Sequence, residues 1–240
     1  MDLRSQEITY EGPDGPLIGS LHWDAEIEGP RAAVLVAPAF WGRKPFDDER
    51  ARELAALGYV GFALDYYGEG KSTFDGAQAH AWKAALDANR PLLAARMFAA
   101  LETVKSHDLV DPDRIAAMGY CYGGKAVLDL AREGADVRGV MTFHGVLDRA
   151  ETASDLPINT NVLVAHGWDD PLVTPEAILD FSREMTERGA AWQIHAYGHT
   201  GHAFTNPAVK AGIQHGFGFD VKATARSWRA LTDFLAECLR

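Results

Sequence analysis

The stretch GYCYG at residues 119–123 places a thiol, Cys121, between two glycines, after the apolar run RIAAM and before a predicted helix. A nucleophile flanked by glycines at two residues on either side is typical of a sharp strand-to-helix turn that projects a reactive side chain from a sheet. Glycine fits on both sides because a Cβ would clash there. The first amides of the following helix favour the reactive thiolate. Taken alone, the stretch fits a buried structural cysteine at a tight turn equally well.

A thiolate nucleophile needs a base, and the base needs an acid that orients it. Around such a turn the acid and then the histidine follow the nucleophile along the chain. The segment HGWDDPLVTP offers Asp170, which begins a turn before a predicted helix, with Asp169 as the alternative acid. The segment YGHTGHAFTNP offers His202, whereas His199 is interpreted as a solvated loop residue. Three suitable side chains in this order, each at a strand end, favour a triad of Cys121, His202 and Asp170.

A tetrahedral intermediate also needs donors aimed at its oxyanion. The residue after the nucleophile supplies one amide, here that of Tyr122, and the loop after the strand AAVLVA supplies the other, predicted to be that of Phe40. Aromatic residues flank the catalytic candidates and predict an apolar pocket, although some of them could be core residues. They are Phe40, Trp41, Tyr122, Trp168 and Phe204.

Metal and cofactor chemistry have little support in the sequence. His199 and His202 are three residues apart, but they lie on a glycine-rich loop rather than a helix, and neither HExxH nor CxxC occurs. No GxGxxG or P-loop motif follows the first long strand. The sequence therefore predicts no metal and no cofactor.

The elements that must position these residues alternate between strand and helix from residue 31 onward. Strands are predicted at 6–10, 17–23, 31–40, 59–68, 114–118, 137–143, 161–165 and 191–197. Helices are predicted at 47–57, 77–107, 123–132, 175–188 and 224–239, with Pro91 as a break or as the first turn of a second helix. This pattern predicts an α/β fold with a mostly parallel central sheet and helices on both faces. Ligands of such sheets bind beyond the carboxyl ends of the strands, where all the candidates lie.

Bulk properties narrow the classes of partner and location. Residues 1–240 contain no linker-like stretch and are expected to form a single domain. The net charge of −11, with scattered basic residues, disfavours a nucleic-acid partner. No signal-like segment or apolar span of about 20 residues is present, and Cys121 and Cys238 are expected to be reduced thiols. We therefore expect a cytoplasmic protein without membrane contact, as a monomer or a small homo-oligomer.

The segments MGYCYGGK, HGWDDPLVTPE and GHAFTNP together resemble the dienelactone hydrolase family of α/β-hydrolases. The resemblance covers nearly the whole chain, from AAVLVAPAFWG to SWRALTDFLAE. It implies an α/β-hydrolase fold, a Cys121–His202–Asp170 triad, and hydrolysis of an ester or lactone through a thioester intermediate.

Two positions depart from the family pattern. Ala39 stands where the family has a glutamate that holds the resting thiol, and Asn206 stands where it has an arginine that grips a substrate carboxylate. Lys83 or Arg90 is a candidate for the second family arginine. Loss of a nearby carboxylate favours pairing of the thiolate with the imidazolium, and loss of the arginine weakens binding of anions. The chain is also similar to a phosphotriesterase-like branch of the family that lacks the glutamate.

The sequence thus predicts a cysteine hydrolase of neutral, activated esters or lactones, with promiscuous phosphotriesterase and arylesterase activity. Its partner is a small ester-type molecule. The alternatives within the same class are a hydrolase of carboxylate lactones such as dienelactone, or a thioesterase. The alternatives outside it are a non-catalytic ligand-binding protein and a metal-dependent hydrolase.

Overall fold

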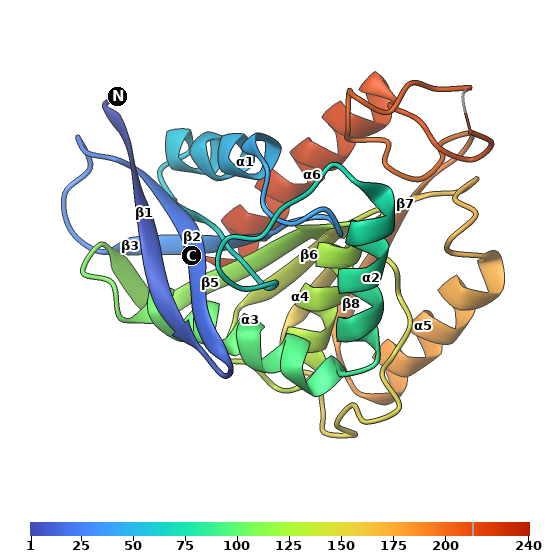
Figure 1. Ribbon diagram of the computed structural model, residues 1–240, viewed down its shortest axis with the longest axis horizontal. Helices are drawn as coiled ribbons and strands as arrows, with labels where there is room; N and C mark the ends of the chain where they lie inside the picture. The colour runs from blue at the N-terminus through green and yellow to red at the C-terminus, as the bar shows by residue number, and fades with distance from the viewer. Residues whose placement is uncertain (213) are drawn as a thin grey trace.

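A computed structural model of the chain describes residues 1–212 and 214–240, and these residues form one eight-stranded sheet (Figure 1). The strand order is β1-β2-β4-β3-β5-β6-β7-β8. The strands are β1 Leu3–Gly12, β2 Gly15–Asp24, β3 Arg31–Ala37, β4 Val60–Ala63, β5 Val110–Tyr120, β6 Gly139–Phe143, β7 Asn161–Gly167 and β8 Ala191–Tyr197. β2 pairs antiparallel with both β1 and β4, and every other pairing is parallel. The predicted mostly parallel α/β sheet is confirmed.

Helices cover both faces of the sheet, as the alternation of strand and helix predicts. The helices are α1 Pro45–Ala56, α2 Gly76–Asp87, α3 Arg90–Lys105, α4 Tyr122–Arg132, α5 Pro175–Glu187 and α6 Val221–Cys238. α1 and α6 pack on one face, and α3, α4 and α5 on the other, with α2 outside α3 (Figure 1). Side chains of β5 alternate between the two cores: Ala117 faces one and Met118 the other. The sheet is therefore buried on both faces in its centre.

Several predicted boundaries differ from the observed ones. β4 ends at Ala63 rather than at residue 68, because the Asp65 carboxylate accepts the amides of Tyr67, Gly68 and Gly70 and so turns the chain out of the sheet. The region 77–107 is two helices, with Pro91 in the first turn of α3, where its missing N–H costs nothing. The other predicted elements agree within a few residues, except that β5 begins four residues earlier than predicted and β1 and β2 are longer.

The carboxyl ends of the parallel strands meet at one edge of the sheet. Cys121 follows β5 directly, His144 follows β6, Asp170 follows β7, and His202 lies beyond β8. In sheets of this kind that edge is where ligands bind. None of the helices described is both long enough and apolar enough to cross a membrane.

Candidate active site

Cys121 occupies a strained turn between β5 and α4. Its backbone has φ 52° and ψ −112°, in a region that a residue with a Cβ rarely adopts. A Cβ on Gly119 would lie 2.2 Å from the carbonyl oxygen of Gly123, and one on Gly123 would lie 2.2 Å from that of Ala37. Both glycines are therefore required by close backbone approach, as the sequence predicts. The turn leaves the half-buried thiol at the first turn of a helix.

His202 and Asp170 form a buried pair beyond the ends of β8 and β7. The His202 Nδ1 donates to Asp170 Oδ2 at 2.7 Å, and both side chains are almost completely buried. The second carboxylate oxygen, Oδ1, accepts the Leu172 amide at 2.8 Å, which fixes the orientation of the carboxylate. The His202 backbone is held on both sides, because its amide donates to Gly216 O and its carbonyl accepts from Gly218 N. The ring is thus presented in one orientation.

The two alternatives considered from the sequence lie outside this pair. Asp169 is exposed, and the structure gives its side chain no hydrogen bond to the histidine. His199 is also exposed, on a turn with φ 57°. The structure thus brings together Asp170 and His202, the two residues preferred from the sequence.

The charge environment of His202 links it to the thiol. Burial lowers the pKa of His202, but the neighbouring Cys121 and the hydrogen bond that His202 donates to Asp170 outweigh burial and raise the pKa to about 10. Thiol and carboxylate therefore act on the same imidazole. A thiol, an imidazole and a carboxylate in this order can move a proton from sulfur to nitrogen and stabilise the resulting ion pair.

A second histidine, His144, packs against the first and was missed in the sequence. Its ring centroid lies 5.0 Å from that of His202 in an edge-on contact, and its Nε2 hydrogen-bonds Thr205 Oγ1 at 2.8 Å. Burial, and then the charge of His202, lower the pKa of His144 well below its usual value, so it stays neutral beside an imidazolium. The signal available was its position in FHG, directly after a predicted strand.

The two amides predicted to bind an oxyanion come from adjacent segments. Tyr122 is the first residue of α4, and Phe40 lies in the loop between β3 and α1. The contact of Gly123 with Ala37 and Pro38 shows that this loop packs against the first turn of α4. Within the described part of the chain, neither the Phe40 nor the Tyr122 amide donates a backbone hydrogen bond. Both remain available to a ligand.

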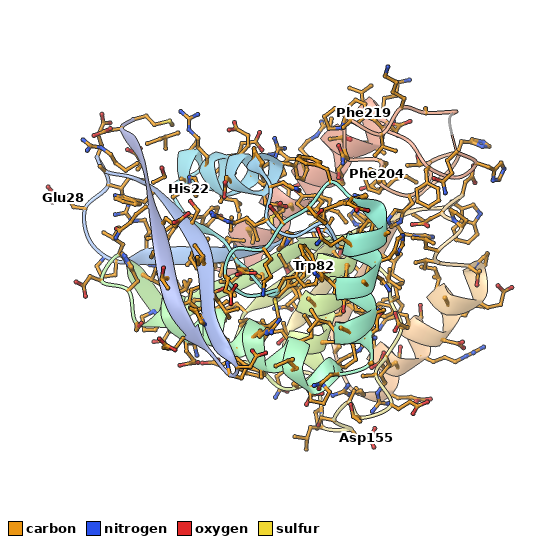
Figure 2. The ribbon with its side chains drawn as sticks, in the orientation of Figure 1. His22, Glu28, Trp82, Asp155, Phe204 and Phe219 are labelled. Carbon is orange, nitrogen blue, oxygen red and sulfur yellow. The ribbon has the colours of Figure 1, made fainter. Side chains whose placement is uncertain are left out.

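The predicted pocket residues fall into two groups. Ala39, Phe40 and Trp41 are half-buried on one loop, with the rings of Phe40 and Trp41 4.3 Å apart, and Trp168 is 48% exposed. Phe204 (labelled in Figure 2) is instead fully buried in the core, behind His144, so it does not line an open pocket. Its ring follows His202 by two residues and packs inward under the loop.

The side chains of Asn206 and Tyr122 make contacts within the chain rather than facing an open pocket. The Asn206 carbonyl Oδ1 accepts the amide of Ala208 and so caps a local turn. The Tyr122 ring is fully buried and packs edge-on against Tyr66. Only the backbone of Tyr122 is therefore placed to meet a substrate.

Two lysines near the Tyr122 ring are paired with carboxylates. Lys125 lies between Asp87, at 3.1 Å, and Asp148, at 2.9 Å, and Lys83 pairs with Asp87. The Lys83 ammonium lies 5.3 Å from the Tyr122 ring centroid, and the Lys125 ammonium lies 5.5 Å from it. They are therefore neutralised within the chain.

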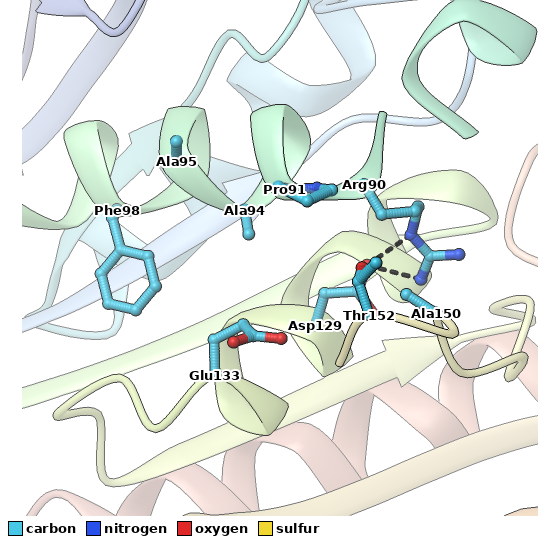
Figure 3. A pocket seen from close by; sticks show the side chains of 9 residues that line it. All are labelled: Arg90, Pro91, Ala94, Ala95, Phe98, Asp129, Glu133, Ala150 and Thr152. Atoms are coloured by element: carbon cyan, nitrogen blue, oxygen red, sulfur yellow. Dashed lines mark hydrogen bonds and ion pairs between the residues drawn. The ribbon is translucent and has the colours of Figure 1, made fainter. Parts of the chain in front are cut away.

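Arg90, the other candidate for a family arginine, faces away from the thiol site. Its guanidinium binds Asp129 and Asp148 at the edge of a 360 Å³ cavity between α3, α4 and the loop after β6 (Figure 3). The lining of that cavity includes Phe98 and Glu133 but none of the three catalytic candidates. In the described part of the chain, no cluster of three His, Cys, Asp or Glu side chains is arranged to hold a metal ion.

Comparison with known proteins agrees with this architecture. A family model described as "Dienelactone hydrolase family" matches residues 21–239. A crystal structure of a dienelactone hydrolase-like promiscuous phosphotriesterase from metagenomic libraries superimposes with a TM-score of 0.94 at 33% identity, covering 100% of both chains. A structure named m3DLH gives 0.92 at 35% identity, again over 100% of both chains. A probable 2-oxo-3-(5-oxofuran-2-ylidene)propanoate lactonase of Bradyrhizobium sp is 26% identical over 74% of this chain and 75% of its own. The chain therefore belongs to the dienelactone hydrolase family and is a hydrolase of ester or lactone bonds.

Proposed function

We propose that the protein hydrolyses neutral, activated esters and lactones through a thioester formed at Cys121. The observation that carries this proposal is the buried 2.7 Å hydrogen bond between His202 and Asp170, at an imidazole whose pKa the neighbouring Cys121 and Asp170 raise. Nucleophile, base and orienting acid are thereby present in the order that covalent catalysis requires.

The proposed reaction has two steps, acylation of Cys121 and hydrolysis of the resulting thioester. His202 holds the proton from the Cys121 thiol, and the thiolate attacks the ester carbonyl to give a tetrahedral oxyanion. The intermediate collapses, the C–O bond breaks, and the imidazolium gives its proton to the leaving alcohol. Water then attacks the thioester while His202 accepts its proton, and the acid leaves as the thiol is restored. Asp170 stabilises the imidazolium in both steps.

The preference for neutral substrates follows from the charges around the thiol. Lys83 and Lys125 are neutralised by Asp87 and Asp148, so they offer little attraction to a substrate carboxylate. Asn206, at the position where the family resemblance implies an arginine, makes a turn contact to its own chain. A neutral aryl ester entering past Phe40 and Trp41 avoids the cost of burying an unpaired charge.

Phosphotriesters are a second candidate substrate class. They are neutral and activated, and the relative at 33% identity over the full chain is a promiscuous phosphotriesterase. The same thiolate would attack phosphorus and expel an aryl alcohol, leaving a phosphorylated cysteine for water to hydrolyse.

A substrate panel with matched cysteine variants tests the proposal. The panel contains a neutral aryl ester, a neutral lactone, an anionic dienelactone, an acyl thioester and an aryl phosphotriester. Cys121→Ala is expected to reduce turnover of the neutral aryl ester by at least about 10³-fold, whereas Cys238→Ala leaves it within about twofold of wild type. Intact mass spectrometry of a slowly turned over ester is expected to show the acyl group on Cys121.

Other outcomes point to the competing functions. Full activity of Cys121→Ala would overturn the cysteine mechanism. If kcat/KM is higher for the anionic dienelactone or for the acyl thioester than for the neutral aryl ester, the neutral lactone and the phosphotriester, the protein is a carboxylate-lactone hydrolase or a thioesterase instead. Absence of turnover across the panel, with Cys121 still labelled by an alkylating agent, would favour a ligand-binding protein.

A further inference from the structure

The loop that carries the Phe40 amide has all its carbonyls engaged. Residues 38–41, between β3 and α1, are called the 38–41 loop below. The single hydroxyl proton of Tyr66 is shared between the Pro38 carbonyl, at 2.7 Å, and the Ala39 carbonyl, at 2.8 Å. The Phe40 carbonyl accepts the Tyr67 hydroxyl at 3.0 Å. Two adjacent phenols thus hold three successive peptide groups.

The far end of the loop is held by a different segment. The Ala39 carbonyl also accepts the Gly42 amide at 3.1 Å, and the Trp41 carbonyl accepts the Thr73 amide at 3.0 Å. Gly42 has φ 78°, and a Cβ on it would lie 2.2 Å from the Lys71 carbonyl oxygen. Every carbonyl of the 38–41 loop therefore has a donor, while the Phe40 amide has no acceptor among the described residues.

The two tyrosines are themselves rigidly mounted. They follow Asp65, whose carboxylate accepts three amides of the turn after β4. The Tyr66 ring is fully buried and packs edge-on against Tyr67 at 4.8 Å, and Trp82 of α2 (labelled in Figure 2) packs on Tyr67 at 5.4 Å. The phenols can therefore impose their positions on the 38–41 loop rather than follow it.

We propose that Tyr66 and Tyr67 are positioning residues that aim the Phe40 amide at the oxyanion formed on the Cys121 substrate. This inference rests on the proposed function. In a trans peptide the N–H points opposite to the carbonyl of the preceding residue, so fixing the Ala39 carbonyl also fixes the Phe40 N–H. Donors oriented before the reaction stabilise the developing charge without reorganisation, which lowers the barrier in the transition state more than in the ground state.

The electrostatics of the site keep both phenols in the donor form. Burial, and then neighbouring groups that include Cys121, raise the pKa of Tyr66 well above its usual value. Burial, then the charge of Asp87 and then that of Cys121, raise the pKa of Tyr67 as well. A thiolate at Cys121 therefore makes the neighbouring tyrosines harder to ionise, and their hydroxyls keep donating to the loop carbonyls throughout the reaction.

The test removes each hydroxyl without changing the ring. Tyr66→Phe is expected to lower kcat for a neutral aryl ester by about 10-fold to 100-fold, with KM within about threefold of wild type. Tyr67→Phe removes the bond to the Phe40 carbonyl, which lies outside the peptide that carries the Phe40 amide, and is expected to lower kcat by about 3-fold to 10-fold. Tyr59→Phe is the matched control, because Tyr59 packs with the core on the other face of the sheet and its hydroxyl is not one of those that donate to the loop. Its kcat is expected to stay within about twofold of wild type.

Alkylation of Cys121 by iodoacetamide separates positioning from general damage. That reaction forms an S–C bond and expels iodide, so it develops no oxyanion and needs no amide donor. Its rate in Tyr66→Phe and Tyr67→Phe is expected to stay within about twofold of wild type while kcat falls. A merely structural role would slow both reactions together.

Two results overturn the inference. One is a kcat of Tyr66→Phe equal to wild type with the fold intact, and the other is an alkylation rate that falls in parallel with kcat. If Tyr66→Phe does not fold, Tyr67→Phe decides by the same criteria. Failure here is distinct from failure of the proposed function, because Cys121→Ala would still be inactive in the first case and active in the second.

Discussion

The two cysteines of this protein lie at opposite ends of helices, and they differ in the charged groups and the backbone conformation around the thiol. Cys121 precedes the first turn of α4, whereas Cys238 ends the last turn of α6. Both are free thiols of intermediate exposure. Burial and the neighbouring Glu237 raise the pKa of Cys238 to about 11, whereas Cys121 neighbours His202, whose own pKa is raised by the thiol and by Asp170.

The comparison leads us to expect that exposure alone does not decide whether a thiol is reactive. Cys121 lies at the positive end of a helix and beside His202, while the negative end of a helix and a carboxylate oppose the thiolate at Cys238. The backbone adds to the difference, because Cys121 occupies a strained turn with φ 52° while Cys238 has an ordinary helical position. Reactivity is therefore a property of the strand-to-helix turn and of the His202–Asp170 pair behind it.

Removing the carboxylate behind His202 is expected to have the largest effect on this contrast. Asp170→Asn replaces the carboxylate with an amide that can neither stabilise the imidazolium nor select the same tautomer, so kcat for a neutral aryl ester is expected to fall by about 10³-fold to 10⁴-fold. Asp169→Asn, one residue away and exposed, is the matched control and should remain within about twofold of wild type. The reverse order of the two variants would assign the acid to Asp169 and break the proposed triad.

Competitive alkylation compares the two thiols directly. At pH 7 a thiol with a pKa of about 11 is ionised to only about one part in 10⁴, so iodoacetamide is expected to label Cys121 at least about 100-fold faster than Cys238. His202→Ala removes the imidazolium and should reduce this ratio by at least about 10-fold. Peptide mapping by mass spectrometry measures both rates in one sample. Equal labelling of the two thiols in wild type would contradict the comparison.

Local signals in the sequence were sufficient to select the candidate residues of the proposed site. A few neighbouring residues are enough to recognise the glycines around Cys121 and the strand-end positions of Asp170 and His202. The order of the three residues along the chain, nucleophile, acid and histidine, then indicates that they belong to one site. The alternation of apolar strands and helices likewise predicted the sheet, because each element carries its own periodicity. These features can be predicted without knowing which strands are neighbours in the sheet.

The features that sequence reasoning missed depend on contacts between distant segments. Tyr66 reaches the 38–41 loop because β4 pairs with β3, with Ala63 opposite Val36. His144 reaches His202 across more than fifty residues of chain, and Phe204 points into the core although its neighbour His202 faces the site. The end of β4 was missed for a local reason, since an Asp65 carboxylate that accepts three amides outweighs an apolar strand-like pattern.

The smallest expected effect concerns Cys238 and the alkaline stability of the fold. Its thiol ionises near pH 9 in the unfolded chain and near pH 11 in the folded one, so between these values the unfolded state binds fewer protons. The contribution to stability is therefore fully present below about pH 9 and is lost as the pH rises through about 11.

Cys238→Ala removes this loss, and the fall in Tm from pH 8 to pH 11 is expected to be smaller in the variant by about 1 to 3 °C, since the site is partly exposed. The slope isolates ionisation from packing, because the Cys238 sulfur lies against β6 and its removal lowers Tm equally at every pH. An identical fall in Tm for wild type and variant would mean that the end of α6 does not disfavour the thiolate, and that the contrast between the two thiols rests on the imidazolium at Cys121 alone.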